Sequence, residues 1–194
     1  MEQAPTAPAK VHAYEPPRFG RYVLLAPIGA GGMGEVFLAK THGAEGFEKL
    51  CVIKKILPSM TKDEELVARF VDEAKILVKL THGSIAQVFD MGVVGDEYYI
   101  AIEFVDGKDL RQIMARQKER QRAMSPALAC YVLSRVLDAL AYAHRKADDS
   151  DRPLELVHRD ISPQNILISY EGEVKVIDFG LAKVATGQRR TSPQ

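Results

Sequence analysis

The chain has 194 residues, 46% of them hydrophobic, which is enough to bury one core or two small lobes. Lys and Arg together number 26, as do Asp and Glu, so no net charge draws the chain to nucleic acid or to an anionic membrane surface. The composition therefore excludes a disordered chain and gives no support to nucleic-acid binding.

The first 17 residues predict a flexible leader, because prolines stand there among alanines and polar residues and bury too little surface to become ordered. No apolar stretch approaches the roughly 20 residues of a membrane span, and the N-terminus lacks the apolar segment of a signal peptide. Cys51 and Cys130 lie in apolar runs, so we expect small buried side chains rather than a disulfide or a metal site. Reduced cysteines fit a cytoplasmic location.

A glycine-rich segment, residues 28–36, is the first sign of a binding site. Gly29, Gly31 and Gly34 leave the backbone free to approach phosphate groups, and glycine permits the positive φ angles that aim N–H groups at phosphate oxygens. By itself the spacing also fits a flexible turn or a dinucleotide site. A dinucleotide site requires a helix directly after the glycines, whereas a short strand-like run follows them here. The segment therefore predicts a β-hairpin that could cover phosphates.

Residues 50–57 read as a third strand that carries two adjacent lysines. Period-two alternation puts Lys54 on the same face as Val52 and Ile56, and Lys55 on the opposite face. One lysine is therefore expected to point inward and the other into solvent. A register shifted by one residue would exchange the two roles.

Residues 63–80 predict a helix, since acidic residues occupy its first turn and apolar residues recur at helical spacing. Glu73 lies in the apolar stripe. A buried carboxylate is unfavourable unless a cation or a hydrogen-bond donor meets it, so Glu73 needs a partner, and Lys54 is the natural one. Alternatively, the stripe ends at the edge of a crevice and Glu73 needs no partner.

The following segments complete a small sheet and begin a helical region. Residues 86–93 and 98–105 predict two further strands around a Gly-Asp turn, which brings the expected total to five strands and one helix. A polar helix over residues 109–121 comes next. The Ser-Pro pair at 125–126 then predicts the start of an apolar core helix that ends near His144. Its expected core residues are Leu128, Val132, Val136, Leu137 and Leu140.

Three polar side chains near the C-terminus border short apolar runs. Asp160 and Asn165 belong to one such region, and Asp178 to a second. A rigid scaffold at loop positions of this kind can hold carboxylate and amide oxygens for a hard cation. Each residue alone would be an ordinary turn former. Following the glycine hairpin, the lysine and the helical glutamate in this order, they indicate one site.

With its Gly-Gly-Met-Gly-Glu-Val loop, the His-Arg-Asp motif at 158–160 and the Asp-Phe-Gly motif at 178–180, the chain resembles a bacterial eukaryotic-like serine/threonine protein kinase from about Phe19 onward. The resemblance implies an α+β, two-lobe fold. Residues 18–105 would form an N-lobe with a five-stranded antiparallel sheet and one helix, and residues 106–194 a partial, mainly helical C-lobe ending in the activation segment. It also implies ATP- and Mg²⁺-dependent transfer of the γ-phosphate to Ser or Thr hydroxyls of unidentified protein substrates.

The resemblance also assigns roles to particular residues. Asp160 would accept or orient the proton of the substrate hydroxyl, and Lys54, paired with Glu73, would hold the α and β phosphates. Asn165 and Asp178 would bind Mg²⁺. The nucleotide would contact Ile28, Gly29, Gly31, Gly34, Val36, Val52, Ile102, Glu103, Val105 and Leu167. Plain core packing is the alternative for the apolar members of this set. A stack joining the lobes would comprise Leu77, Val88, His158 and Phe179.

Three features depart from the family pattern. Ser162 stands where serine/threonine kinases usually carry a lysine that touches the transferred phosphate, so we expect slow transfer or a cation from elsewhere. Val52 replaces the usual alanine above adenine. The sequence stops soon after the Asp-Phe-Gly motif, as expected for a fragment of a longer kinase or, alternatively, for a naturally short protein. The core helix would then expose an apolar face, which could lead to self-association.

Other functions remain open. A non-catalytic nucleotide-binding or scaffold module would explain Ser162 and the missing lobe, and a small-molecule phosphotransferase of related fold is the enzymatic alternative. Arg159, which in the family meets a phosphorylated activation loop, could bind phosphate on Thr186, Thr191 or Ser192.

Overall fold

The computed structural model describes residues 16–31, 34–43, 46–56, 64–148, 150–154 and 156–179. Nearly all of the predicted leader and the whole segment after Phe179 lie outside these residues. The expectations for Gly180, Thr186, Thr191 and Ser192 therefore fall outside the described part of the chain.

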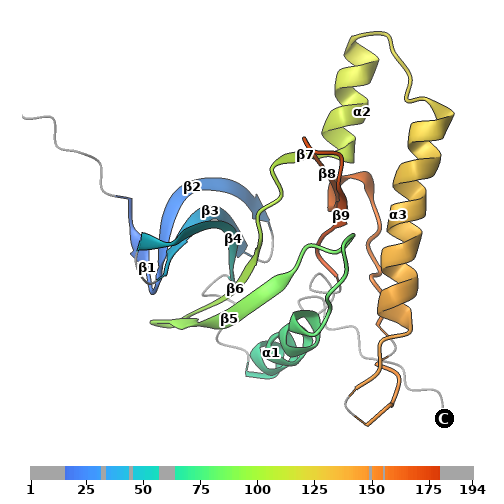
Figure 1. The fold of residues 1–194 in the computed structure, drawn as a ribbon. Helices are drawn as coiled ribbons and strands as arrows, with labels where there is room; N and C mark the ends of the chain where they lie inside the picture. The colour runs from blue at the N-terminus through green and yellow to red at the C-terminus, as the bar shows by residue number, and fades with distance from the viewer. Residues whose placement is uncertain are drawn as a thin grey trace, which may run out of the picture.

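A six-stranded antiparallel sheet forms the N-terminal lobe, in the order β1-β2-β3-β4-β6-β5 (Figure 1). The strands are β1 (Arg18–Phe19), β2 (Tyr22–Gly31), β3 (Gly34–His42), β4 (Glu48–Ile56), β5 (Val88–Val94) and β6 (Glu97–Glu103). The sequence predicts five of them, and the structure adds β1. This strand has only two residues, so it leaves no periodic pattern in the sequence.

Helix α1 (Glu64–Val78) lies beside β5 at one face of the sheet (Figure 1). Its residues Ala74 and Leu77 are buried, as is Leu80 just beyond its end. Lys75 in the last turn places a positive charge near the negative end of the helix dipole. The helix predicted over residues 63–80 is thus confirmed, with its apolar stripe against the core.

The C-terminal lobe combines two helices with a three-stranded sheet of order β7-β8-β9. Its elements are β7 (Gly107–Asp109), α2 (Leu110–Glu119), α3 (Pro126–His144), the 3-10 turn η2 (Pro163–Asn165), β8 (Ile166–Ser169) and β9 (Val174–Val176). Ser125 caps α3 as predicted, because its Oγ accepts a hydrogen bond of 3.2 Å from the Leu128 amide. Asp109 caps α2 in the same way, through the Gln112 amide at 2.8 Å.

One face of α3 enters the core that both lobes share. Val132, Val136, Ala139 and Ala143 are buried, and α3 packs on β9. The sequence also predicts Leu128 and Leu137 as core residues, which is wrong, since these two side chains are 41% and 63% exposed. The expectation of an exposed apolar face on this helix is confirmed, and self-association through it stays a prediction.

Helix α3 also bears on the expectation that no apolar stretch approaches the length of a membrane span. Within the described ranges it is the single helix long and apolar enough to cross a membrane, with 19 residues. The expectation was therefore too strict. Length and composition are weak evidence for a span, and the buried side chains of α3 belong to the protein core.

The two faces of the N-terminal sheet bury different clusters. The core shared with the C-terminal lobe includes Ile100 of β6, while a second cluster on the opposite face contains Cys51 and Ile53 of β4. Burial raises the pKa of the Cys51 thiol to about 11, so this cysteine behaves as a small apolar side chain. Cys130 is exposed, so its predicted burial is wrong, and neither cysteine forms a disulfide. A cytoplasmic location stays a prediction.

Candidate functional site

The glycine-rich hairpin is formed by β2 and β3, with Gly31 paired to Gly34 beside its turn. Gly29 and Gly34 have extended rather than left-handed backbones, so the expectation of positive φ is wrong at these two positions. A Cβ on Gly34 would lie 1.7 Å from the carbonyl oxygen of Lys55, so glycine is required there by the close approach of β4. A Cβ on Gly29 would meet nothing closer than Val36 at 3.8 Å. Fold packing therefore explains Gly34, and it leaves Gly29 without a structural requirement.

Lys54 projects from the middle of β4 toward the C-terminal lobe. Its backbone pairs with Val36 of β3 and Ile100 of β6. Its Nζ donates a hydrogen bond of 2.7 Å to Oδ1 of Asp178, 124 residues further along the chain. The ion pair is largely enclosed, with the two side chains 18% and 33% exposed. The predicted register, with Lys54 on the inward face, is confirmed.

Lys55 lies on the opposite face of β4, as predicted. Its side chain is not exposed to solvent, so that part of the prediction is wrong. Its Nζ lies 2.9 Å from Oε2 of Glu97 and 4.2 Å from the centre of the Phe19 ring. Only 13% of the side chain is exposed. The sheet curls, and β1 brings an aromatic ring over this lysine, so Lys55 helps to hold the outer cluster of the N-terminal lobe.

Glu73 lies in α1, the helix that the sequence assigns to it. Its side chain is outside the described residues, and the Lys54–Glu73 pair stays a prediction. The described partner of Lys54 is Asp178.

Asp160 and Asn165 are joined side chain to side chain. Nδ2 of Asn165 donates hydrogen bonds of 2.9 Å to Oδ2 and to the backbone oxygen of Asp160. Asn165 is buried, and its own amide bonds to the Ser162 carbonyl within η2. The Asp160 residue is exposed. A buried amide thus fixes one oxygen of an accessible carboxylate, and no other described residue bonds to its Oδ1.

A backbone bond brings Asp178 to the same place. The Ile177 amide donates to the Asn165 carbonyl at 3.0 Å, which extends the β8–β9 pairing by one step and sets Asp178 beside η2. Asp178 and Arg159 both adopt left-handed backbones, with φ of 60° and 67°. Such geometry is uncommon for residues other than glycine and costs about 1–3 kcal/mol each. The two positions flank the cluster, as strained residues often do at functional sites.

His158 links the segment that contains Asp160 to the segment that leads to Asp178. Its Nε2 donates to the Ile177 carbonyl at 2.8 Å, and its Nδ1 accepts from the Asp160 amide at 3.3 Å. These two bonds define one neutral tautomer. Burial lowers the pKa of His158 below its ordinary value, against the opposing effect of the bond to Ile177. The ring also packs against Phe179, with centroids 4.5 Å apart.

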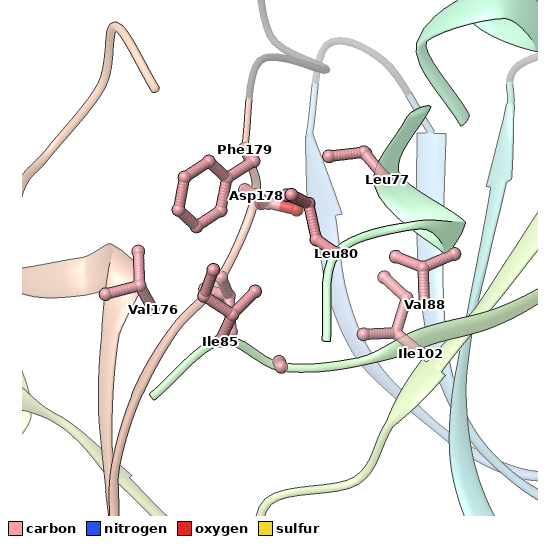
Figure 2. Close-up of a pocket in the computed structure, with 10 residues that line it drawn as sticks. Leu77, Leu80, Ile85, Val88, Ile102, Val176, Asp178 and Phe179 are labelled. Atoms are coloured by element: carbon pink, nitrogen blue, oxygen red, sulfur yellow. The ribbon is translucent and has the colours of Figure 1, made fainter. Parts of the chain in front are cut away.

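The predicted stack between the lobes is present. Leu77, Val88 and Phe179 line one cavity of about 20 Å³, with Ile102 on the side of the sheet. Figure 2 shows the Phe179 ring and the Asp178 carboxylate leaving the chain on opposite sides. The cavity has room for about one water molecule. Phe179 therefore fills the junction of the lobes, while Asp178 turns toward Lys54.

The apolar residues predicted to contact a nucleotide share an intermediate exposure. Val36, Val52, Ile102, Val105 and Leu167 are all half-buried, and Ile28 is 52% exposed. Core residues of the same strands, such as Ile53 and Ile100, are fully buried. These side chains therefore keep part of their surface accessible, although Ile102 also packs against the shared core, and their contact with a nucleotide stays a prediction.

The sequence did not single out Lys175, although it bears on the site. This residue of β9 is buried, and its Nζ lies 2.8 Å from Oε1 of Glu103 at the end of β6. The other carboxylate oxygen of Glu103 accepts from the Gln87 amide at 3.0 Å. The link ties the segment that connects the lobes to the strand leading to Asp178. A lysine within the apolar run Val-Lys-Val-Ile was the available signal.

Ser162 provides no replacement for the missing lysine. Its Oγ is buried and has no hydrogen-bond partner among the residues that the structure describes. The position therefore contributes a neutral hydroxyl and no positive charge.

The protonation of His158 predicts a pH dependence of stability. A lowered pKa means that the unfolded chain binds a proton that the folded chain does not, so the stability from neutral His158 is full above about pH 6.5 and declines as the pH falls through the folded-state pKa. We expect His158→Gln, which keeps one donor and one acceptor, to flatten the fall in melting temperature between pH 7.5 and 5.5. His144→Gln at the exposed end of α3 is the matched control. An unchanged slope for His158→Gln would contradict this assignment.

Comparison with known proteins agrees with the fold and the motifs. Residues 22–193 match the family described as protein kinase domain. The chain is 39% identical to MasK of Myxococcus xanthus, named a tyrosine-protein kinase, and 34% identical to PrkC of Bacillus subtilis, named a serine/threonine-protein kinase. The matches cover 85% and 84% of this chain but 26% and 23% of the relatives, so the chain spans about a quarter of their length.

Comparison with solved structures also gives the fold of a protein kinase domain. The crystal structure of the PknI kinase domain of Mycobacterium tuberculosis matches with a TM-score of 0.67 and 29% identity, over 92% of this chain and 70% of that domain. The predicted two-lobe architecture is therefore confirmed. By sequence and by structure, the chain belongs to the protein kinase domain family.

Proposed function

We propose that the protein transfers the γ-phosphate of ATP to Ser or Thr hydroxyls of protein substrates in a Mg²⁺-dependent reaction. The observation that carries the proposal is a connected polar cluster between the lobes. Lys54 forms an ion pair with Asp178. Asp178 is next in sequence to Ile177, whose amide donates a hydrogen bond to the Asn165 carbonyl. The Asn165 side chain in turn bonds to Asp160. Phosphoryl transfer requires little more than such positioned charges, because catalysis consists mainly of orientation and electrostatic stabilisation.

Asp160 is proposed to act on the acceptor hydroxyl. Asn165 occupies Oδ2, and Oδ1 of the exposed carboxylate is open to accept the hydroxyl proton. Lys54 is proposed to bind the α and β phosphates of the nucleotide. Its ammonium is held on the side of the cleft by Asp178, so it needs no large rearrangement to meet a phosphate oxygen. Glu73 stands as its second proposed partner.

The described side chains fit a magnesium site at Asn165 and Asp178. No group of three or more His, Cys, Asp or Glu side chains gathers in the described ranges, so a cation here would also take oxygens from phosphates and water. Asn165 directs Nδ2 to Asp160, which leaves its Oδ1 as a free acceptor. Asp178 uses Oδ1 for Lys54 and retains Oδ2. A bound Mg²⁺ would neutralise phosphate charge during transfer.

The nucleotide base is proposed to lie between the half-buried residues of the sheet and Leu167 of β8. Glycine at 29 leaves room for phosphates below the hairpin, and backbone groups of Glu103 and Val105 would bond the base edge. Lys175 supports this arrangement, since its ion pair with Glu103 fixes the connection between the lobes. The remaining proposed contacts are Ile28, Gly31, Gly34, Val36, Val52 and Ile102.

Two alternatives follow from specific observations. The neutral hydroxyl of Ser162, without a described hydrogen-bond partner, favours slow transfer, or a nucleotide-binding module without turnover. The relative named a tyrosine-protein kinase raises tyrosine as an acceptor in place of Ser or Thr. A small-molecule phosphotransferase remains the third alternative.

The test uses one protein preparation and two measurements. Calorimetry measures the binding of a non-hydrolysable ATP analogue with and without Mg²⁺, and transfer from labelled ATP is followed to peptides that differ only in a Ser, Thr or Tyr acceptor. We expect Mg²⁺-dependent binding and transfer to Ser or Thr. Binding without any transfer would leave the non-catalytic module. Transfer to tyrosine alone, or to an aminoglycoside and to no peptide, would replace the proposed acceptor.

A further inference from the structure

A basic groove runs along α2, outside the cluster described above. It has a volume of about 520 Å³ and is lined by Lys108, Arg116, Arg120 and Arg122 together with Gln112 and Gln117. Four of these side chains carry a positive charge, and no acidic residue lines the groove. We call this feature the α2 groove.

The positive charge of the α2 groove is local rather than a property of the chain. Residues 108–122 contain six Lys and Arg against two Asp and Glu, whereas the whole chain contains 26 of each kind. Glu119 neutralises Arg116 through an ion pair of 2.8 Å. Lys108, Arg120 and Arg122 form no ion pair with any other described residue. All three are exposed, so water and ions screen their repulsion, and an anionic ligand would lower it further.

Fold stability does not account for this arrangement. Gln112 and Arg116 lie four residues apart on one side of α2, Lys108 precedes the helix in β7, and Arg120 is its C-cap residue. The helix buries none of its residues. The helix dipole favours cations in the last turn, which accounts for Arg116, but Lys108 precedes the helix and Arg122 lies beyond its C-cap, so neither the dipole nor the core accounts for these two.

The α2 groove begins next to the residues proposed for catalysis. Lys108 lies in β7 and pairs with Ile168 of β8, the strand that directly follows Asn165. Helix α2 also contacts η2, the turn between Asp160 and β8. In Figure 1 α2 rises from β7 toward the outer end of the C-terminal lobe. A peptide whose acceptor residue reaches Asp160 could therefore continue along α2.

We propose that the α2 groove binds an acidic segment of the protein substrate, close to the acceptor residue. This inference rests on the proposed kinase function and assigns it a substrate class. The helical part from Gln112 to Arg120 rises about 12 Å. An extended peptide advances about 3.3 Å per residue, so a segment of about four residues spans that part. Asp and Glu side chains at alternate positions of such a segment would meet the arginines, whose planar guanidinium groups suit carboxylates.

The test compares two double variants that each remove two charges from the same helical region. Arg120→Gln with Arg122→Gln removes two of the four positive charges of the groove, and Arg111→Gln with Lys118→Gln removes two exposed cations that do not line it. Fluorescence anisotropy measures the binding of a labelled peptide with a Glu-rich flank and of the same peptide with Gln in place of Glu. We expect the groove variant to bind the acidic peptide roughly 3- to 30-fold more weakly, and the control variant to bind it nearly as the wild type does.

Other results would overturn the proposal. Equal losses in both variants would indicate non-specific charge attraction, and no loss in either would show that the peptide binds elsewhere. If a DNA oligonucleotide of matched charge binds more tightly than the acidic peptide, and the groove variant no longer binds it, the groove would be assigned to nucleic acid. Because binding is measured without turnover, acidic-peptide binding by a protein that transfers no phosphate would refute the kinase proposal and leave the groove standing.

Discussion

Replacing Asp160 by asparagine is expected to lower the rate of phosphate transfer by about 10²–10⁴-fold, the usual contribution of a positioned general base. Asparagine preserves the shape of the side chain and can still accept the hydrogen bond from Nδ2 of Asn165. It cannot take a proton from the acceptor hydroxyl. Binding of the ATP analogue should therefore remain close to that of the wild type, since Asp160 is assigned to the acceptor and not to the nucleotide.

The control for this prediction is Asp96→Asn, an exposed aspartate in the turn between β5 and β6. It should alter neither transfer nor binding. Single-turnover transfer and calorimetric binding are measured on the same preparations. Transfer by Asp160→Asn within a few-fold of the wild-type rate would remove Asp160 from the reaction. A matching loss of nucleotide affinity would instead point to a damaged fold.

The second large effect is expected at Lys54. In Lys54→Met the Asp178 carboxylate loses its cation in a partly enclosed site, and the proposed phosphate contact is lost with it. We expect ATP-analogue binding and transfer to fall below detection or by roughly two orders of magnitude, a loss of about 3 kcal/mol, as when one partner of a charged contact in a complex is removed. Unfolding temperature should change less than binding, because the ammonium faces the cleft rather than the core.

Lys55→Met is the matched control one residue away, and the structure gives it a different outcome. It loses the contacts with Glu97 and with the Phe19 ring, so we expect a decrease in unfolding free energy of about 1–2 kcal/mol. Nucleotide affinity should be retained, because this side chain lies on the far face of the sheet. Thermal melts and calorimetry of both variants decide the question. Equal losses of affinity would mean that the inward and outward roles are wrongly assigned.

Local signals in the sequence were reliable wherever the physical cause was local. Ser125 and Pro126 mark the start of α3 because a cap and a fixed φ act within one helical turn. The glycine hairpin follows from the strand-like run after the glycines, and the direction of Lys54 follows from period-two alternation, which a pleated strand imposes. The order of Lys54, Asp160, Asn165 and Asp178 was sufficient to predict one site.

Contacts between distant segments could not be read in the same way. Cys51 and Cys130 both stand in apolar runs, yet only Cys51 is buried, because the sheet covers it on the outer side and nothing described covers Cys130. The environment of Lys55 depends on β1, a two-residue strand without periodicity. Gly34 is required by the approach of β4, and not by the left-handed backbone that the sequence suggested.

By itself the sequence determined the elements, the inward lysine, the motif residues and the kinase family, since these depend on short-range periodicity and on side-chain chemistry in a fixed order. Only the tertiary structure decided that Lys54 meets Asp178, that Lys175 is bound to Glu103, and that the cations around α2 line one groove. Such pairings arise when the chain closes long loops, and their partners are set by sheet curvature and lobe packing. No local pattern encodes that geometry.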